Sequence, residues 1–169
     1  MTLKKQNGNL IKKARLYSST PTDVEKIHDD LPDTKWTSQI PCKLDQTKRI
    51  YIDADLANVE NLAGSRIDFG IDDHAFGYKI EVSKDAKNWV VVVDHTSQKV
   101  LGGESISSSA TAIRQITSRG DNQYLYDQPL RIIQDRFFLE GRYVRLSFTS
   151  SEQETIHPSL AEWMIFKQP

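Results

Sequence analysis

The sequence lacks several features that would assign it to a common functional class. Cys42 is the only cysteine among 169 residues, so neither an internal disulfide nor a cysteine-based zinc site can form. No apolar run is long enough to cross a bilayer, so no transmembrane segment is expected. Lysine plus arginine number 22 against 23 aspartates plus glutamates, with both signs interspersed along the chain. That pattern leaves no electrostatic footprint for nucleic acid.

The amino-terminal residues MTLKKQNGN lack the apolar middle region of a signal peptide. A domain cut from a longer protein would have lost such a leader, so the localisation stays open between the cell exterior and the cytoplasm. The length and the 38% hydrophobic content suit one core. We therefore expect a single domain over residues 1–169, with 1–8 as a flexible tail, forming one monomeric part of a larger protein.

Catalytic signatures are also lacking. The four histidines do not show the i, i+4 spacing of a zinc helix, and no serine lies in a GxSxG turn. The adjacent pair Asp72 and Asp73 has no second group placed opposite it, and neighbouring side chains tend to point apart. We therefore expect a protein that is not an enzyme.

What the sequence does contain is strand periodicity. In RIYIDADL, residues 49–56, apolar side chains alternate with polar ones, as in a half-buried strand. Four further short segments are rich in β-branched and aromatic residues and are bounded by turn formers: 78–83, 89–94, 142–148 and 161–166. Many short strands without intervening helices predict an all-β sandwich or jelly roll.

Two segments depart from this pattern. TPTDVEKIH carries Thr20 as a cap and Pro21 at the first helical position, which predicts a short helix or turn. Residues 102–128, rich in serine, predict a long loop or hairpin insertion, and long loops in compact domains are often functional. Trp36, Trp89 and Trp163 each lie beside apolar neighbours, so we expect all three in the core.

Three pieces in a fixed order carry a family resemblance: NLIKKARLYSS followed by HDDLPDTKW, then YKIEVSKDAKNW, then GRYVRLSFT leading to LAEWMIF. Together they resemble the discoidin family, also called coagulation-factor type C domains, and the related family 32 carbohydrate-binding modules. The resemblance implies an eight-stranded jelly roll that binds glycans, lipids or proteins through loops at one end. Asp30 and Ala86 stand where the family has glycine, so the turn at Ala86 is expected to be of a different type.

The resemblance also implies a structural calcium ion. Its oxygen ligands would come from the Asp29 and Glu162 carboxylates, from Thr34, and from carbonyls at or near Lys26, Leu31 and Ala161, a donor set that suits Ca²⁺. Such an ion would join two distant parts of the chain, with Asp33 left facing solvent. The alternative reading of the same residues is an Asx or proline turn at DLPDT, with Glu162 pointing to solvent on an alternating strand.

A sugar site is expected in the loops. The histidine, arginine and asparagine that grip galactose in some relatives have no counterpart here, which disfavours that mode. The loops instead offer aromatic rings flanked by polar groups, a combination that can cover a sugar face and bind its hydroxyls. The candidate ligand-binding residues are His74, Phe76, Asp73, Arg119, Asn122, Tyr124, Tyr126 and His157.

These observations make a glycan-binding module the expected function, with calcium as its structural ion and a glycan as its partner. Two alternatives remain open at this point. One is a protein-interaction or adaptor domain. The other is a membrane-lipid binder, for which only Ile40 and Phe76 could serve as apolar spikes.

Overall fold

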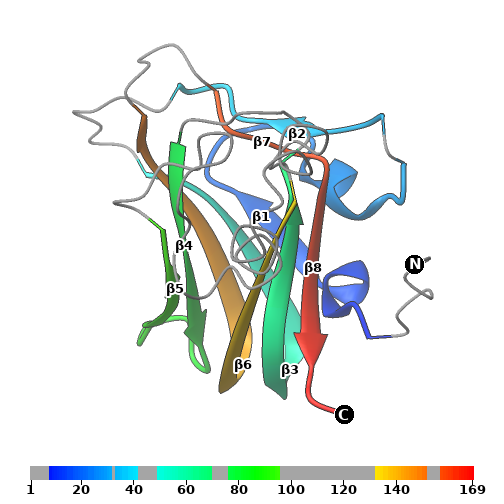
Figure 1. Ribbon diagram of the computed structural model, residues 1–169, viewed down its shortest axis with the longest axis vertical. Coiled ribbons are helices and arrows are strands. Elements are labelled where there is room, and N and C mark those ends of the chain that lie inside the picture. The colour runs from blue at the N-terminus through cyan, green and yellow to red at the C-terminus, as the bar shows by residue number, and fades with distance from the viewer. Residues whose placement is uncertain (1–7, 32, 42–48, 70–75, 96–131, 152–156) are drawn as a thin grey trace, which may run out of the picture.

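The computed structural model describes residues 8–31, 33–41, 49–69, 76–95, 132–151 and 157–169. These residues form eight strands and two short 3-10 helices (Figure 1). The strands are β1 (Arg15–Ser18), β2 (Trp36–Thr37), β3 (Ile50–Asp68), β4 (Phe76–Ser83), β5 (Val90–Asp94), β6 (Ile132–Ser151), β7 (Ser159–Leu160) and β8 (Glu162–Lys167); the helices are η1 (Leu10–Lys13) and η2 (Val24–His28).

Two long strands, β3 and β6, connect the layers of the sandwich. Residues 50–55 of β3 pair with β1 and with residues 143–148 of β6, whereas residues 62–68 pair with β8 and with residues 132–139 of β6. The register shifts in between, where Ala57 has a φ of 68°. Because β4 and β5 extend only the first half and β8 only the second, the strands form the two layers of a β-sandwich. This confirms the predicted all-β jelly roll.

The core lies between the two layers and follows the predicted alternation. In β3, Ile50, Ile52 and Ala54 are fully buried, while the residues between them are half-buried. Two glycines permit close approaches near the bend. A Cβ on Gly64 would lie 2.4 Å from the Asp135 carbonyl oxygen, and one on Gly141 would lie 2.1 Å from Cγ1 of Val82. Larger residues at these positions would push the strands apart.

The register places most loop stems at one end of the sandwich. Ile50 pairs with Phe148, while Asp68 pairs with both Ile132 and Glu162, so both ends of β3 and of β6 lie at that end. We call it the loop end. Residues 42–48, 70–75, 96–131 and 152–156 join strands there and lie outside the described residues, as do the insertion expected at 102–128 and most of the tail expected at 1–8.

Two details of the local predictions were wrong. The short helix or turn predicted in TPTDVEKIH is present as the 3-10 helix η2, but it begins at Val24 after Asp23, so Thr20 does not cap it. Thr20 is instead buried, with its hydroxyl 3.4 Å from that of Ser18. Trp89 is half-buried at the β4–β5 turn, with the Arg145 guanidinium 4.3 Å from its ring centroid, so it does not belong to the core. Trp36 and Trp163 are buried as expected.

The turn at Ala86 keeps the backbone that glycine favours. Ala86 has a φ of 60°, so the expected change of turn type was wrong. The Asp85 carboxylate holds this conformation, because it accepts hydrogen bonds from the amides of Lys87 and Asn88 at 2.9 and 2.8 Å. These contacts hold the pKa of Asp85 well below its usual range. The hydrogen bonds thus offset the strain of alanine in the left-handed region.

Replacing Ala86 with glycine is therefore expected to stabilise the protein by about 0.5–1 kcal/mol, since it relieves left-handed strain at some entropic cost. Urea unfolding followed by tryptophan fluorescence measures this difference. Ala14→Gly is the matched control, because Ala14 has an extended backbone with φ −76°, and there glycine should destabilise. A loss of stability in both variants would contradict the strain argument.

Candidate metal centre and binding end

The acidic turn after η2 is organised around the Asp29 carboxylate. Its Oδ2 accepts a 2.6 Å hydrogen bond from the Thr34 hydroxyl, and its Oδ1 accepts one of 3.0 Å from the Leu31 amide. These two bonds hold the pKa of Asp29 below its usual range. The bond to the amide two residues ahead is that of an Asx turn, so this part of the alternative reading is correct. The carboxylate is therefore ionised and fixed in orientation.

Glu162 does not behave as a solvent-facing residue. It begins β8, and both of its carboxylate oxygens are buried without a hydrogen-bond partner among the described residues. Burial and, to a smaller extent, the nearby charges of Asp30 and Asp29 together raise its pKa to about 7, against smaller opposing effects of the Asp30 amide and Lys12. A buried carboxylate without a partner costs free energy. The second part of the alternative reading, with Glu162 in solvent, is wrong.

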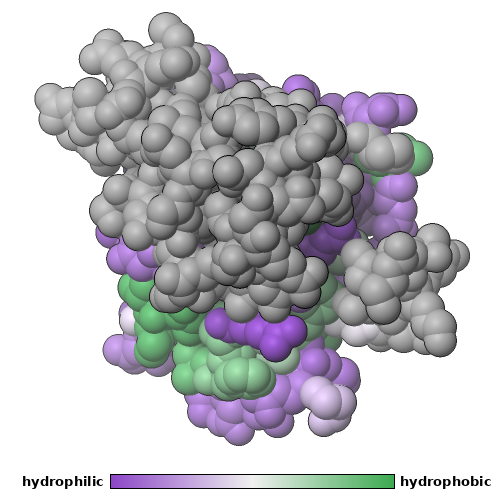
Figure 2. Space-filling view, viewed as in Figure 1, coloured by the Kyte–Doolittle hydropathy of each residue, from purple (hydrophilic) through white to green (hydrophobic). Residues whose placement is uncertain are grey.

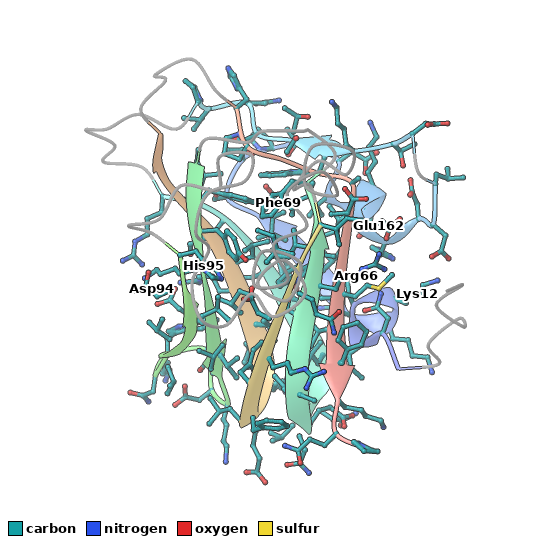
Figure 3. All side chains as sticks on the ribbon, viewed as in Figure 1. Lys12, Arg66, Phe69, Asp94, His95 and Glu162 are labelled. Carbon is teal, nitrogen blue, oxygen red and sulfur yellow. The ribbon has the colours of Figure 1, made fainter. Side chains whose placement is uncertain are left out.

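The other residues implied as calcium ligands lie around these two carboxylates. The Leu31 carbonyl already accepts from the Thr34 amide and hydroxyl, at 3.3 and 3.1 Å. Lys26 lies in η2, which packs against β8, and Ala161 directly precedes Glu162 and is buried. Figure 3 shows Glu162 at the start of β8, beside the helical turns that carry this cluster. The fold thus brings both halves of the expected set to the loop end.

A lysine that sequence reasoning missed also reaches this cluster. The ammonium of Lys12, in η1, forms an ion pair with the Asp30 carboxylate. Asp30 has a left-handed backbone with φ 60°, as the glycine of related domains would. Asp33 is exposed, as expected. Lys12 lies eighteen residues from Asp30, and no local motif links the two. Its position therefore needed the three-dimensional structure.

Of the expected ligand-binding side chains, the structure describes only that of His157. It is exposed, and its Nδ1 lies 2.8 Å from the Ser38 carbonyl, while the Ser38 amide donates to the Pro158 carbonyl at 2.9 Å. This joins the segments after β2 and before β7, two of the expected binding loops. Phe76 begins β4 at the loop end, but its side chain lies outside the described residues. The remaining candidates lie outside them entirely: His74, Asp73, Arg119, Asn122, Tyr124 and Tyr126.

A buried polar network lies beneath the loop end, between the two layers. Asp135 of β6 accepts a 2.8 Å hydrogen bond from the Tyr78 hydroxyl, and its other oxygen lies 2.9 Å from Nε2 of His95. Figure 3 labels His95, directly after β5. At most 1% of each of these residues is exposed. Burial, together with the Asp135 charge, raises the pKa of Tyr78 well above its usual value. The network fastens the starts of β4 and β6 to the residue after β5.

Sequence reasoning missed this network for a physical reason. Its members are 40 and 57 residues apart, and each one follows or interrupts an apolar run. The available signal was a lone acid in IIQDRFF and a lone histidine directly after WVVVVD. A buried polar residue needs a partner, but the sequence does not say which one.

Known protein structures share this fold at low sequence identity. No protein-family model matches the chain, and no curated protein matches it by sequence. The CpGH89CBM32-6 module produced by Clostridium perfringens superposes with a TM-score of 0.62 at 16% identity, covering 95% of this chain and 99% of that one. Chitosan-binding module 1 of a chitosanase/glucanase from Paenibacillus sp. IK-5 gives 0.62 at 17% identity, covering 94% and 98%.

A larger enzyme contains the same fold as one part. A GH29 fucosidase from Ruminococcus gnavus, solved with fucose, gives a TM-score of 0.65 at 15% identity, covering 95% of this chain but 27% of the fucosidase. At such identities the comparison establishes the architecture alone. The chain therefore has the jelly-roll fold of family 32 carbohydrate-binding modules.

Proposed function

We propose that this chain is a non-catalytic glycan-binding module that recognises its sugar at the loop end. The observation that carries the proposal is the convergence of the loop stems at that end, over a rigid base. His95, Tyr78 and Asp135 form this base, and the bond between His157 and Ser38 joins two of the loops. Several loops held on a rigid scaffold are a common way to build a binding site.

The fold supports the same proposal by analogy. The two modules named above are described as carbohydrate-binding and chitosan-binding, and the fucosidase carries this fold as about a quarter of its length. A module of this kind raises the local concentration of an attached enzyme on a polysaccharide by tethering it. We accordingly propose that the chain acts as one part of a larger glycan-directed protein.

We further propose that a calcium ion joins the acidic turn to β8. The residues fit such an ion on two counts. The cluster offers hard oxygen donors from two carboxylates, a hydroxyl and backbone carbonyls, which is the chemistry that Ca²⁺ selects. Moreover, the buried oxygens of Glu162 have no partner among the described residues, and Asp29 and Asp30 repel the negative charge of an ionised Glu162. A divalent cation would remove both costs.

The proposed ligands are the Asp29 and Glu162 carboxylates, the Thr34 hydroxyl, and carbonyl groups at or near Lys26, Leu31 and Ala161. The ion would act structurally, because these residues lie near opposite ends of the chain and a link between them closes a long loop. This chain's own contribution is the prior orientation of Asp29 by Thr34 and Leu31. In the ion's absence, Lys12 partly neutralises the cluster through Asp30.

A glycan array tests the proposed function. The chain, labelled at its amino terminus, is expected to bind a restricted set of glycans, and Phe76→Ala or Tyr124→Ala should remove that binding. Val90→Ala is the control, because Val90 is 53% exposed at the start of β5, beside the β4–β5 turn. A blank array with the calcium-loaded chain, together with a protein that co-purifies with it, would overturn the proposal in favour of an adaptor domain.

A further inference from the structure

The two outer faces of the sandwich differ in whether their cationic side chains form ion pairs. On the face formed by β1, β4, β5 and the first half of β3, each arginine of β6 pairs with an aspartate. Arg142 binds Asp55 through two hydrogen bonds of 2.7 and 2.9 Å, and Arg145 binds Asp53 at 2.7 and 2.8 Å. That face is electrostatically self-compensated, so its cations are not available to a charged ligand.

The opposite face carries cations without partners. Within the described part of the chain, the side chains of Arg66, Arg136 and Lys167 form no ion pair or hydrogen bond. Register places Arg66 beside Gln134, and Gly64 beside both Arg136 and Phe166, so these residues share one outer surface of β3, β6 and β8. We call this surface the cationic face. Two acids of this surface, Asp68 and Glu162, pair in register towards the loop end, and Asp68 has a partner of its own.

The cationic face contains a groove. A hollow of about 440 Å³ lies over the position where Gly64 contributes no side chain, and Gln134, Arg136, Phe166 and Lys167 surround it. This volume falls within the range of small-ligand sites. Asp135 reaches the groove only with its backbone, because its carboxylate is committed to Tyr78 and His95 inside the sandwich. The charge lining the groove is therefore positive.

An exposed aromatic ring extends the same surface. Phe138 lies two residues beyond Arg136 on β6, so strand alternation places it on the same side, and 73% of it is exposed. This is the largest exposed fraction among the big apolar residues that the structure describes. Figure 2 shows strongly hydrophilic residues adjoining apolar ones on the lower part of the face turned to the viewer. Rings beside guanidinium groups give both stacking and charge recognition.

From these observations we propose that the cationic face binds an acidic glycan whose sugars carry carboxylate groups. The phenylalanine rings cover the apolar faces of the sugars, Arg66 and Arg136 bind the carboxylates, and the Gln134 amide bonds to hydroxyls. Two arginines and one lysine are too few for nucleic acid, which demands a longer track of cations.

This site is separate from the loop-end site and goes beyond the proposed function. A carboxylate polymer engages the side of the sandwich, whereas the loops engage a sugar at its end. The two proposals can be contradicted independently. A blank array of neutral glycans would contradict only the loop-end site, and absent binding of an acidic polymer would contradict only the cationic face. A chain that used both would bind a mixed polysaccharide with avidity.

Affinity electrophoresis tests the proposal with polygalacturonate and with its fully methyl-esterified form, which keeps the sugar ring and loses the charge. The unmodified chain should bind polygalacturonate. Its affinity for the ester should be at least about tenfold lower, since hydrogen bonds between charged groups contribute on that scale. Arg66→Gln/Arg136→Gln should weaken polygalacturonate binding by a similar factor, and Phe138→Ala should weaken it several-fold, at an unchanged melting temperature. Lys87→Gln, at the exposed β4–β5 turn, is the control for lost positive charge and should bind normally.

Two further polymers separate the possible partners. Poly-L-glutamate and single-stranded DNA carry negative charge without sugar carboxylates. Binding of either one as tightly as polygalacturonate would overturn the glycan assignment in favour of an acidic peptide or general polyanion surface. A double arginine variant that still binds polygalacturonate normally, or no binding by the unmodified chain, would overturn the site itself.

Discussion

Replacing Asp135 with alanine is expected to lower the free energy of unfolding by about 2–6 kcal/mol, because it leaves two buried polar groups without their partner and each such group costs about 1–3 kcal/mol. The substitution leaves the Tyr78 hydroxyl and Nε2 of His95 buried without their acceptor. Nδ1 of His95 already lacks a partner among the described residues, so the ring cannot transfer its bond elsewhere without moving. Urea unfolding measures the change.

Asp53→Ala is the matched control for this loss. It also removes an aspartate that accepts hydrogen bonds from a side chain distant in sequence, but 21% of the Asp53 side chain is exposed, against 1% for Asp135. Water can solvate the arginine that remains, so the expected loss is about 1 kcal/mol. Asp135→Asn, which keeps one acceptor, should lie between the two. A loss at Asp135 no larger than that at Asp53 would contradict the structural importance of the buried network.

Removing calcium is expected to lower the melting temperature by roughly 5–10 °C. An ion held at 100 times its Kd stabilises the folded state by about 2.7 kcal/mol, and each kcal/mol shifts the melting temperature of a domain this size by about 2–4 °C. Differential scanning fluorimetry with excess Ca²⁺, and then with a chelator, measures the shift. Magnesium is the matched control, because its smaller ion demands octahedral geometry and should restore little of the lost stability.

Glu162→Gln distinguishes this ion from a general salt effect. The variant should lose the calcium response, and without calcium it should be at least as stable as the parent at pH 7, because it removes a buried negative charge. A parent-like calcium response in Glu162→Gln would rule out the proposed ligand set.

The chelated protein should also show a pH dependence of defined sign. Burial raises the folded-state pKa of Glu162 to about 7, from a usual value of 4.5. Between these values the folded state binds more protons than the unfolded state, so its stability falls as the pH rises from about 5 to about 7. Glu162→Gln should lack this component, and calcium should suppress it in the parent. Melting curves across this pH range measure both effects.

Much of the fold could be predicted from the sequence, because strand alternation is local. The alternation in residues 49–56 predicted a half-buried strand, and the structure shows the same alternation of buried and half-buried residues from Ile50 onwards. The full length of β3 was not predicted, because the strand bends near Ala57 and its register shifts, which interrupts the alternation. β2 and β7 contain two residues each, too few for any periodicity to appear. Short and bent strands are thus defined by their partners.

The candidate sites also differ in how far they could be predicted, according to whether their residues are close in sequence. Asp29 and Thr34 are close in sequence, and the family resemblance implied both as ligands of one ion, so a short turn suffices to bring them into contact. The role of Glu162 was open between a ligand implied by the resemblance and a solvent-facing side chain, and the burial of its carboxylate oxygens rules out the second. The cationic face could not be predicted, because Arg66, Arg136 and Lys167 come from three strands and only strand register brings them together.

The central claim is that this jelly roll recognises a glycan through its loop end. The most direct test is a titration of the isotopically labelled, calcium-loaded chain with the best ligand from the glycan array, followed by amide chemical shifts. The account predicts that shifts concentrate at the loop end, including Ser38 and His157, while residues of the β4–β5 turn such as Asp85 stay unchanged. Shifts that avoid the loop end at saturating ligand would contradict it.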